Sequence, residues 1–319
     1  MTETGSTGAG TFVHRPVMLN EVIDALHIRP DGTYIDGTAG GAGHSAAIAE
    51  RLTTGRLIAL DRDETAVRAA SERLARFGDR ARVIHTNFSD LRAVCAGLGI
   101  DKIDGLLLDL GCSSPQLDVA ERGFSYINDA RLDMRMDQTA ALDAYRVVNE
   151  FSQEDLTRII RDWGEEKFAY RIAELICRRR AEAPIETTGQ LVGLIKDALP
   201  DGGRSQKHHP AMRTFQALRI AVNNELDIIP PVLRDAAGLL APGGRMAIIT
   251  FHSLEDRAVK ETFAELAQGC VCPRSFPVCV CGRTPVIRLV SKKPILPGDA
   301  ELAENARSHS AKLRVAEKL

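Results

Sequence analysis

Residues 34–45 read YIDGTAGGAGHS, which is a short apolar run, a glycine-rich turn and the first residues of a helical pattern. Gly37, Gly40, Gly41 and Gly43 allow the backbone to turn sharply and to approach a bound ligand closely. The helix that follows would present free N–H groups and the positive end of its dipole at the turn. A tight loop without a ligand explains the same residues, so the turn indicates a binding site only together with other features.

Short β-favouring runs alternate with helical patterns around this turn. The expected strands are Thr33–Asp36, Leu57–Asp61, Arg82–Asn87 and Asp104–Leu110, and the expected helices are Ser45–Leu52 and Glu64–Phe77. The fourth run, DGLLLDL, is nearly all apolar, which is typical of a strand buried on both faces. The alternation predicts βαβ units and a parallel sheet, which is a Rossmann-like α/β fold.

Asp61 ends the second expected strand, about 20 residues beyond the glycine turn, where an acidic side chain can accept hydrogen bonds from ribose hydroxyls. An aspartate at a strand end is more often a helix cap, but the pair of features is more specific than either one. Dinucleotide-dependent oxidoreductases share this pattern. The glycines here do not follow a clean G-x-G-x-x-G spacing, and no hydride-transfer site is visible, so that class is a remote alternative.

The alternation stops in the middle of the chain. The expected helices there are Glu154–Trp163, Glu165–Arg180, Thr188–Ala198 and Ala211–Leu226, separated by Pro- and Gly-containing loops. After a turn at Ala241–Gly244, the pattern predicts a strand at Gly244–Phe251, a helix at Leu254–Ala267 and strands at Val286–Ser291 and Lys312–Ala316. We predict a sheet domain of residues 13–132 and 225–319, an inserted all-helical domain of residues 133–224, and a disordered N-terminus of residues 1–12.

Composition restricts the classes of function. The 319 residues carry a net charge of −2, with a pI near 6.5, so any nucleic-acid contact must use local positive charge. Seven cysteines in a chain of this length do not form a disulfide scaffold. No apolar run reaches the roughly 18 residues of a membrane span, and the N-terminus lacks a secretory signal. We expect a cytoplasmic protein with no membrane partner, whereas the oligomeric state stays open.

The fourth strand runs into DLGCSSPQLD, residues 109–118. Asp109 ends the strand over the expected ligand site, and Ser113, Ser114 and Pro115 form a tight polar turn. An ordinary capped turn is the simpler interpretation. However, a small polar turn with proline also suits methylation of an exocyclic base amine, whose lone pair is delocalised into the ring. Acceptors that hold the amine N–H groups would aim that lone pair at a methyl donor.

At this point the sequence resembles the bacterial 16S ribosomal RNA cytosine-N4 methyltransferase family, also called MraW or RsmH. The resemblance runs from His14 to Lys318 and includes HRPVMLNEVIDAL (14–26), YIDGTAGGAGHS, LIALDRD (57–63), DGLLLDLGCSSPQLDVAERGFSY (104–126), LDMRMD (132–137), GEEKFAYRIA (164–173), RTFQALRIAVNNEL (213–226), FHSLEDRAVK (251–260) and ENARSHSAKLRVAEK (304–318). Cys112 replaces the valine usual in the family. The resemblance implies a class I methyltransferase sheet with a helical insertion, and N4-methylation of a cytidine in the decoding region of the small-subunit RNA.

The resemblance also implies the site residues. S-adenosylmethionine contacts carry over to Ala42, Gly43, His44, Asp61, Phe88, Asp109 and Gln116. For positioning the base and its amine we name Asp109, Ser113, Ser114, Pro115, Phe251 and His252. Each singly has a plain structural interpretation as a core, capping or strand-end residue. We expect direct in-line methyl transfer without a covalent intermediate, so Cys112 should not be catalytic.

The expected partner is 16S ribosomal RNA, within the small subunit, with the target base unstacked. Candidate contacts are Arg122, Arg131, Arg135, Arg178–Arg180, Arg204, Lys207, His208 and His209. A charged run is more often a solvated helix surface. Two other functions share parts of the pattern: a DNA amino-methyltransferase, and an RNA-binding assembly factor without catalysis, which an intact cofactor site would argue against.

Four of the cysteines are clustered. Cys270 and Cys272 form one C-x-C pair, and Cys279 and Cys281 form another. Four thiolates from two closely spaced pairs can hold Zn²⁺ tetrahedrally, although C-x2-C is the commoner spacing. Two disulfides or four free thiols are the alternatives, and a reducing cytoplasm disfavours disulfides. We favour a structural zinc without a catalytic role, since the motif is not general in the family.

Overall fold

The computed structural model of the protein describes residues 16–205, 207–273, 276 and 278–319. The prediction of a disordered stretch at residues 1–12 lies outside this range. The strands are β1 (Thr33–Asp36), β2 (Arg56–Asp61), β3 (Ala81–His85), β4 (Ile103–Asp109), β5 (Leu240–Thr250), β6 (Ile287–Leu289) and β7 (Lys312–Lys318). All seven predicted strands are therefore present, with ends that shift by a few residues.

The strands form one sheet in the order β3-β2-β1-β4-β5-β7-β6. Neighbours among β1 to β5 are parallel, whereas β7 runs antiparallel to β5 and β6. The chain moves outward from β1 to β3 and then crosses back to β4 on the other side of β1. Such a reversal leaves a crevice beyond the carboxyl ends of β1 and β4, where open α/β sheets bind their ligands. The predicted Rossmann-like α/β fold is present.

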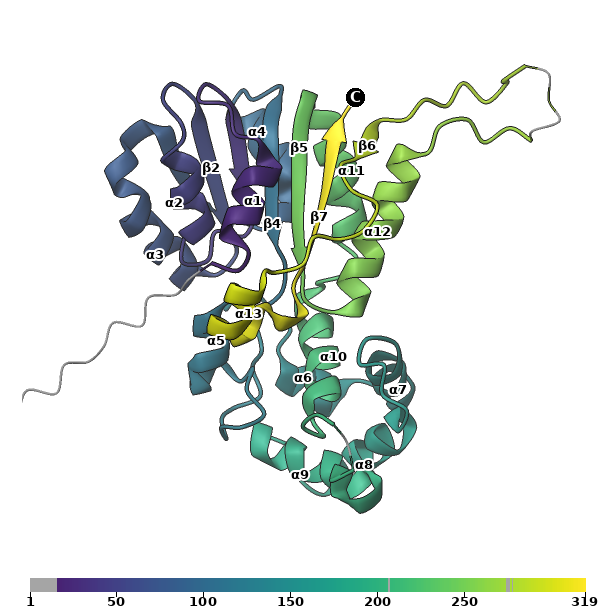
Figure 1. Ribbon diagram of the computed structural model, residues 1–319. Coiled ribbons are helices and arrows are strands. Elements are labelled where there is room, and N and C mark those ends of the chain that lie inside the picture. The colour runs from purple at the N-terminus through teal and green to yellow at the C-terminus, as the bar shows by residue number, and fades with distance from the viewer. Residues whose placement is uncertain (1–15, 206, 274–275, 277) are drawn as a thin grey trace, which may run out of the picture.

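Helices cover both faces of the sheet (Figure 1). The covering helices are α1 (Leu19–Leu26), α2 (Gly43–Ala49) and α3 (Glu64–Leu74) on one face, and α4 (Leu91–Gly97), α11 (Ile229–Leu239) and α12 (Ser253–Ala267) on the other. Each set packs its own apolar cluster against the sheet. β4 has apolar neighbours on both sides, which explains its run of three leucines.

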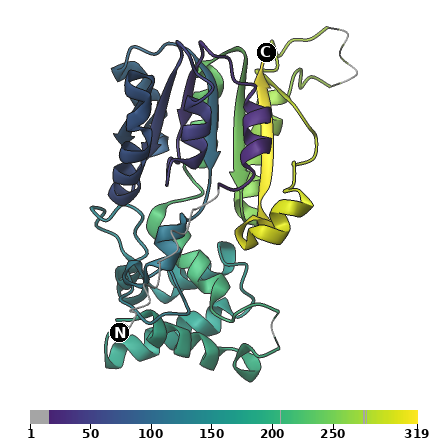
Figure 2. The ribbon, with the colours of Figure 1, turned by 60° about the vertical axis from the view of Figure 1, so that its left-hand side comes forward.

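The remaining helices lie beyond the carboxyl ends of the parallel strands (Figures 1 and 2). They are α5 (Ser114–Asp118), α6 (Ala144–Glu150), α7 (Gln153–Asp162), α8 (Ala169–Glu182), α9 (Thr188–Ala198), α10 (Met212–Asn223) and α13 (Asp299–Glu304). Residues of α6 to α10 bury a separate apolar cluster. Phe124 and Leu132 pack into that cluster although they precede residue 133. Part of the chain before the predicted boundary therefore shares the helical core.

Several elements differ from the sequence-based expectation. Helices α1, α4, α5, α6, α11 and α13 were not predicted. At the start of β5, Leu240 pairs with Ile103 but Arg245 pairs with Gly105, so residues 241–244 loop out of the ladder where a turn was expected. Gly243 has a φ of 79°, which suits this bulge. Within the described part of the chain, no helix is both long enough and apolar enough to cross a bilayer.

Candidate functional site

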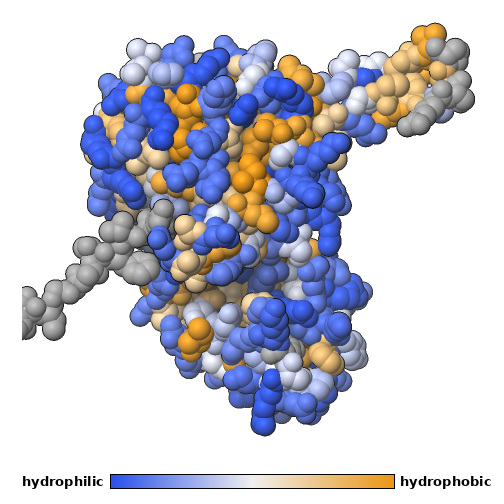
Figure 3. Space-filling model, in the orientation of Figure 1, coloured by the Kyte–Doolittle hydropathy of each residue, from blue (hydrophilic) through white to orange (hydrophobic). Residues whose placement is uncertain are grey.

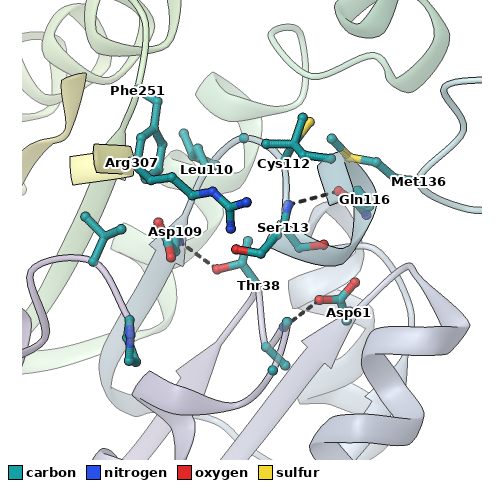
Figure 4. Close-up of a pocket in the computed structure, with 18 of the residues that line it drawn as sticks. Thr38, Asp61, Asp109, Leu110, Cys112, Ser113, Gln116, Met136, Phe251 and Arg307 are labelled. Carbon is teal, nitrogen blue, oxygen red and sulfur yellow. Dashed lines mark hydrogen bonds between the residues drawn. The ribbon is translucent and has the colours of Figure 1, made fainter. Parts of the chain in front are cut away.

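A cavity of about 420 Å³ opens beyond the carboxyl ends of β1, β2 and β4. Figure 4 shows its lining, with side chains from the sheet, the 110–117 segment and the C-terminal segment facing one space. The predicted residues that line it are Gly43, His44, Asp61, Phe88, Asp109, Ser113, Ser114, Pro115, Gln116 and Phe251. Ala42 and His252 are the two predicted residues outside the lining. The fold thus brings together residues from four separate motifs.

The glycine-rich turn is built by unusual backbone angles. Gly40 has a φ of 50° and Ala42, which precedes α2, has a φ of 56°. A Cβ atom at Gly43 would lie 2.1 Å from the ring of Pro16, so only glycine fits there. Ala42 is fully buried, and its role is to shape the turn. These features place the turn and the start of α2 against the cavity.

Asp61 fixes the same turn from β2. One carboxylate oxygen accepts a hydrogen bond from the Gly40 N–H (2.8 Å), and the other accepts one from the Asp63 N–H (2.9 Å). Removal from water raises the pKa of this carboxyl, and the two N–H donors oppose that effect. Each oxygen retains a second lone pair, so the side chain can still accept bonds from ligand hydroxyls.

Asp109 ends β4 at the floor of the cavity (Figure 4). Its backbone N–H donates to Thr38 Oγ1 at 2.6 Å. Its side-chain Oδ1 is shielded from solvent, and no hydrogen-bond partner for it exists among the described residues. Removal from water, together with the nearby carboxyls of Asp36 and Glu255, raises the pKa of Asp109 to about 8. The cavity therefore holds a carboxyl that titrates near neutral pH, with one oxygen that has no hydrogen-bond partner among the described residues.

Asp36, Asp61 and Asp109 end three adjacent strands, and all three carboxyls have raised pKa values. For Asp36 burial raises the pKa to about 6, although Ser45 donates a 2.6 Å hydrogen bond to it. Three carboxyls that are hard to ionise together create a negative potential once they do ionise. A cationic ligand beside these carboxyls would therefore favour their ionised forms, although arginine side chains also line the cavity.

The Ser113–Pro115 turn is held in place by a chain of polar contacts through Gln116 and Asp63. The Gln116 side chain accepts from the Ser113 N–H (3.0 Å) and donates to Asp63 Oδ2 (2.9 Å). Arg122, which is 7% exposed, forms an ion pair with the same Asp63 oxygen at 2.8 Å. The Ser114 hydroxyl lines the cavity, is shielded from solvent and has no partner among the described residues. A ligand could therefore bond to this turn without any rearrangement of it.

The other rim of the cavity is formed where β5 meets α12. Phe251 faces the cavity beside Asp109 (Figure 4). Buried Glu255 accepts from the Phe251 N–H at 2.7 Å, and the His252 ring lies 3.0 Å from its Oε1 and 3.5 Å from its backbone nitrogen. Burial opposes ionisation of Glu255, but His252 and the charge of Arg219 outweigh it and lower the pKa. The contacts of His252 in the structure are those of a helix cap.

Comparison with known proteins identifies the family. The profile described as "MraW methylase family" matches residues 11–319. A relative from Heliobacterium modesticaldum is 54% identical and covers 97% of this chain and 99% of its own. Relatives from Acetivibrio thermocellus (55%, covering 97% and 99%) and Geobacter sulfurreducens (54%, covering 97% and 100%) are similar. All three are named "Ribosomal RNA small subunit methyltransferase H".

The chain belongs to the MraW methylase family. The family resemblance drawn from the sequence motifs is thereby confirmed, and with it the assignment as a methyltransferase. The cavity described above is the place in this MraW methylase where the motifs converge, because residues of the segments 34–45, 104–126, 213–226 and 251–260 all line it.

The cavity of the MraW methylase also contains residues that sequence reasoning did not single out. Thr38, Arg62, Met136, Arg219, Glu225, Glu255 and Arg307 line it. Arg219 forms a two-bond ion pair with Glu225 (2.9 and 2.8 Å) and lies 4.0 Å from Glu255. All seven residues stand inside the quoted family motifs, which was the available signal. Only the fold shows that α10 and the C-terminal segment reach the cavity.

The candidate RNA contacts differ in availability. Arg122 is buried against Asp63, so the expectation that it contacts RNA is not supported. Arg180 donates to the carbonyl oxygens of Val148 and Phe151, which is a structural role. Arg178 and Arg179 of α8 are exposed. At the mouth of the cavity, Arg307 pairs with Asp118 at 2.7 Å.

Proposed function

We propose that this MraW methylase is an S-adenosylmethionine-dependent enzyme that methylates the exocyclic N4 amine of a cytidine in the decoding region of 16S ribosomal RNA. Family membership and the names of the relatives support a methyltransferase acting on small-subunit RNA. The N4 position rests on the family resemblance and on the chemistry of the 109–116 turn. A ribosomal substrate implies action in the cytoplasm.

The cavity suits S-adenosylmethionine. Its sulfonium cation matches the carboxyl of Asp109, and its ribose hydroxyls match the free lone pairs of Asp61, both of which line the cavity. We assign the remaining contacts to Ala42, Gly43 and His44 at the turn, to Phe88 beside the adenine, and to Asp109 and Gln116. Gln116 and Ala42 would act mainly by holding the shape of the site, because Gln116 already bonds Ser113 and Asp63 and Ala42 is buried.

When bound, the cofactor supplies an electrophilic methyl group, and the remaining task belongs to the protein. Asp109 Oδ1 and the Ser114 hydroxyl are unsatisfied polar atoms of the same cavity, and the Ser113–Pro115 segment provides backbone carbonyls. Acceptors of this kind can hold the two N–H groups of the amine and direct its lone pair. Phe251 offers an apolar face for the cytosine ring. The amine loses one proton on methylation, and ionised Asp109 is placed to receive it.

The reaction needs no covalent intermediate with the enzyme. Removal from water raises the pKa of the Cys112 thiol to about 12, so the thiol stays neutral at physiological pH. A neutral thiol is a poor nucleophile. The Cys270–Cys281 cluster takes no part in the reaction, because it lies in a loop that projects away from the cavity (Figure 1).

We further propose that the helical part, residues 133–224, recognises the RNA. It lies beyond the carboxyl ends of the strands, next to the cavity, and carries exposed Arg178 and Arg179 (Figure 2). A base inside folded RNA must leave its stack to enter the cavity, and contacts with the surrounding strand can offset that cost.

The unsatisfied, titratable carboxyl of Asp109 at the end of β4 carries this proposal. Its test is single-turnover transfer of a labelled methyl group from S-adenosylmethionine to small subunits that lack the modification. We expect Asp109→Asn to bind the cofactor but to lose about 10²-fold or more in transfer rate, because the amide keeps one acceptor oxygen but has no charge and cannot take up the proton that the amine loses. The conservative Thr38→Ser variant, which keeps the hydroxyl that accepts from the Asp109 N–H, should stay within a few-fold of wild type. Equal rates for Asp109→Asn and wild type would refute the role of Asp109.

A further inference from the structure

Between α12 and β6, the described residues of the segment 268–286 form a loop that projects from the body of the molecule (Figure 1). Its base is fixed, because the Val286 N–H donates to Leu266 O at 2.8 Å and the Arg283 guanidinium donates to Glu265 O at 2.8 Å. Beyond that base, none of the loop residues that the structure describes belongs to a helix or strand before β6. Loops of this length without structure of their own are uncommon in compact domains.

Among the described residues of the loop, there is no hydrophobic core. Val271, Phe276, Val278 and Val280 are 48%, 50%, 70% and 74% exposed, and the end of the projecting loop in Figure 3 shows this apolar surface. None of the described residues from 268 to 286 is buried. Burial of apolar area therefore cannot stabilise a single conformation of the loop, and some other interaction must do so.

The four clustered cysteines meet within this loop. Their Sγ atoms all lie within 4.8 Å of one another. The Cys279 and Cys281 sulfurs are 3.5 Å apart, and the Cys281 and Cys270 sulfurs are 3.7 Å apart. Two C-x-C pairs, separated along the chain by the turn in which the Phe276 N–H donates to Pro273 O, thus converge on one point.

These separations distinguish among the possible chemistries. A disulfide requires about 2.05 Å between sulfurs. Four thiolates around one Zn²⁺ at about 2.3 Å would be about 3.8 Å apart along each edge of the tetrahedron, close to both sulfur–sulfur distances in the loop. A multi-iron cluster would hold its cysteine sulfurs apart by the width of the cluster itself. The geometry therefore fits a single tetrahedral metal ion.

The surroundings also suit thiolates. The Val280 N–H donates to Cys272 Sγ at 3.4 Å, which is the kind of backbone contact that stabilises negative charge on a ligating sulfur. The described ligands are all exposed or half-buried, so metal can reach them. The cluster lies outside the cavity lining, so the ion would have no contact with the reacting groups.

We propose that Cys270, Cys272, Cys279 and Cys281 bind one Zn²⁺ ion, which stabilises the projecting loop in place of a hydrophobic core. Zinc binding deprotonates the thiols and couples metal affinity to the order of the loop. This site is independent of methyl transfer.

The test is the metal content of full-length protein produced with zinc in the medium and purified reduced, without chelators. We expect about one zinc per chain by elemental analysis, and visible absorption typical of tetrahedral cobalt–thiolate after exchange with Co²⁺. Replacement of all four cysteines by serine should abolish both signals. Cys177→Ser, which alters a cysteine on α8, should leave both unchanged.

A second readout measures the loop directly. Zinc removal, or the four-serine variant, should speed tryptic cleavage after Arg283 by about tenfold or more, since metal-coupled order protects the loop. Absence of metal in the wild-type protein, zinc retained in the four-serine variant, or a mass four hydrogens lower, which would show two disulfides, would each overturn the proposal.

Discussion

Asp109 shows how a single side chain can report on the ligand that its site is built for. Removal from water raises the pKa of its carboxyl to about 8. The carboxyls of Asp36 and Asp61 end the neighbouring strands and also have raised pKa values. Placing a sulfonium cation among them would favour the ionised form and lower the pKa of Asp109. At pH values between this lowered pKa and about 8, cofactor binding must then release a proton from Asp109.

The affinity for S-adenosylmethionine, relative to that for its uncharged product, should therefore depend on pH. From about pH 6 to about pH 8, the Kd for S-adenosylmethionine should fall by about tenfold and then level off. The Kd for S-adenosylhomocysteine, which lacks the sulfonium charge, should change much less. Isothermal titration calorimetry in buffers of different ionisation enthalpy would measure both the affinity and the proton release. Asp109→Asn serves as the control, and a pH-dependent preference that persists in that variant would refute the explanation.

The ionisation of Asp109 should also make the free energy of unfolding depend on pH. A carboxyl with a raised folded-state pKa favours the folded state fully only below its unfolded pKa of about 3.9, and this contribution is lost as pH rises through about 8. Asp109→Asn should therefore raise the free energy of unfolding of the cofactor-free protein at about pH 8, by about 1–3 kcal/mol. Urea unfolding at about pH 5 and pH 8 would show this gain at the higher pH. A gain that is equal at both values would contradict it.

Cys112 provides the complementary residue-scale test. Its thiol, with a pKa raised to about 12, should be dispensable for chemistry. Cys112→Ala should retain about a third or more of the wild-type transfer rate, because it removes a neutral side chain from the cavity wall without removing a nucleophile. A near-total loss of transfer in a folded variant would instead point to a covalent intermediate.

At the scale of elements, the start of α12 allows the structural role of His252 to be tested separately from a chemical one. His252 caps this helix, its ring facing Glu255, while Glu255 bonds back to the Phe251 and His252 N–H groups. His252→Ala should lower the free energy of unfolding by about 1 kcal/mol through loss of the cap. His252→Asn, which preserves a capping side chain, should recover most of that loss.

The same pair of variants tests the proposed contact of His252 with the base. If His252 acts only by positioning Glu255 and Phe251, the asparagine variant keeps most of the transfer rate. A folded His252→Asn protein that loses about 10²-fold in rate would instead show that the imidazole itself contacts the reacting groups.

The elements also show what the sequence could and could not reveal. β4 was predictable because an unbroken apolar run can hardly be anything but a strand between two layers, and the placement of Asp61 close to the glycine turn followed from the order of glycine turn and strand end. Helix α1 was missed because it is only eight residues long, and α11 because its first turn contains two prolines, which are more often found in loops. Arg219 and Arg307 could not be assigned to the cavity, since neither spacing nor composition indicates that α10 and the C-terminal segment meet there.

At the scale of the whole molecule, the slightly acidic chain must bind RNA through local charge. Arg178 and Arg179 are exposed on α8, whereas Arg180 bonds two backbone carbonyls and should be left intact in any test. The double variant Arg178→Glu and Arg179→Glu should weaken binding to small subunits by about tenfold and reduce the salt dependence, with cofactor affinity unchanged. Arg68→Glu, an exposed arginine on α3, provides a matched control. Unchanged subunit binding would remove this surface from the RNA interface.

The central claim is the chemical identity of the methylated atom. The most direct measurement is mass-spectrometric nucleoside analysis of small-subunit RNA after incubation of unmodified subunits with the protein and isotope-labelled S-adenosylmethionine. We predict label in N4-methylcytidine, at a single cytidine of the decoding region, and none in C5-methylcytidine. Label in a different nucleoside, or no transfer to subunits or free RNA by a protein that binds the cofactor tightly, would contradict the proposed amine chemistry.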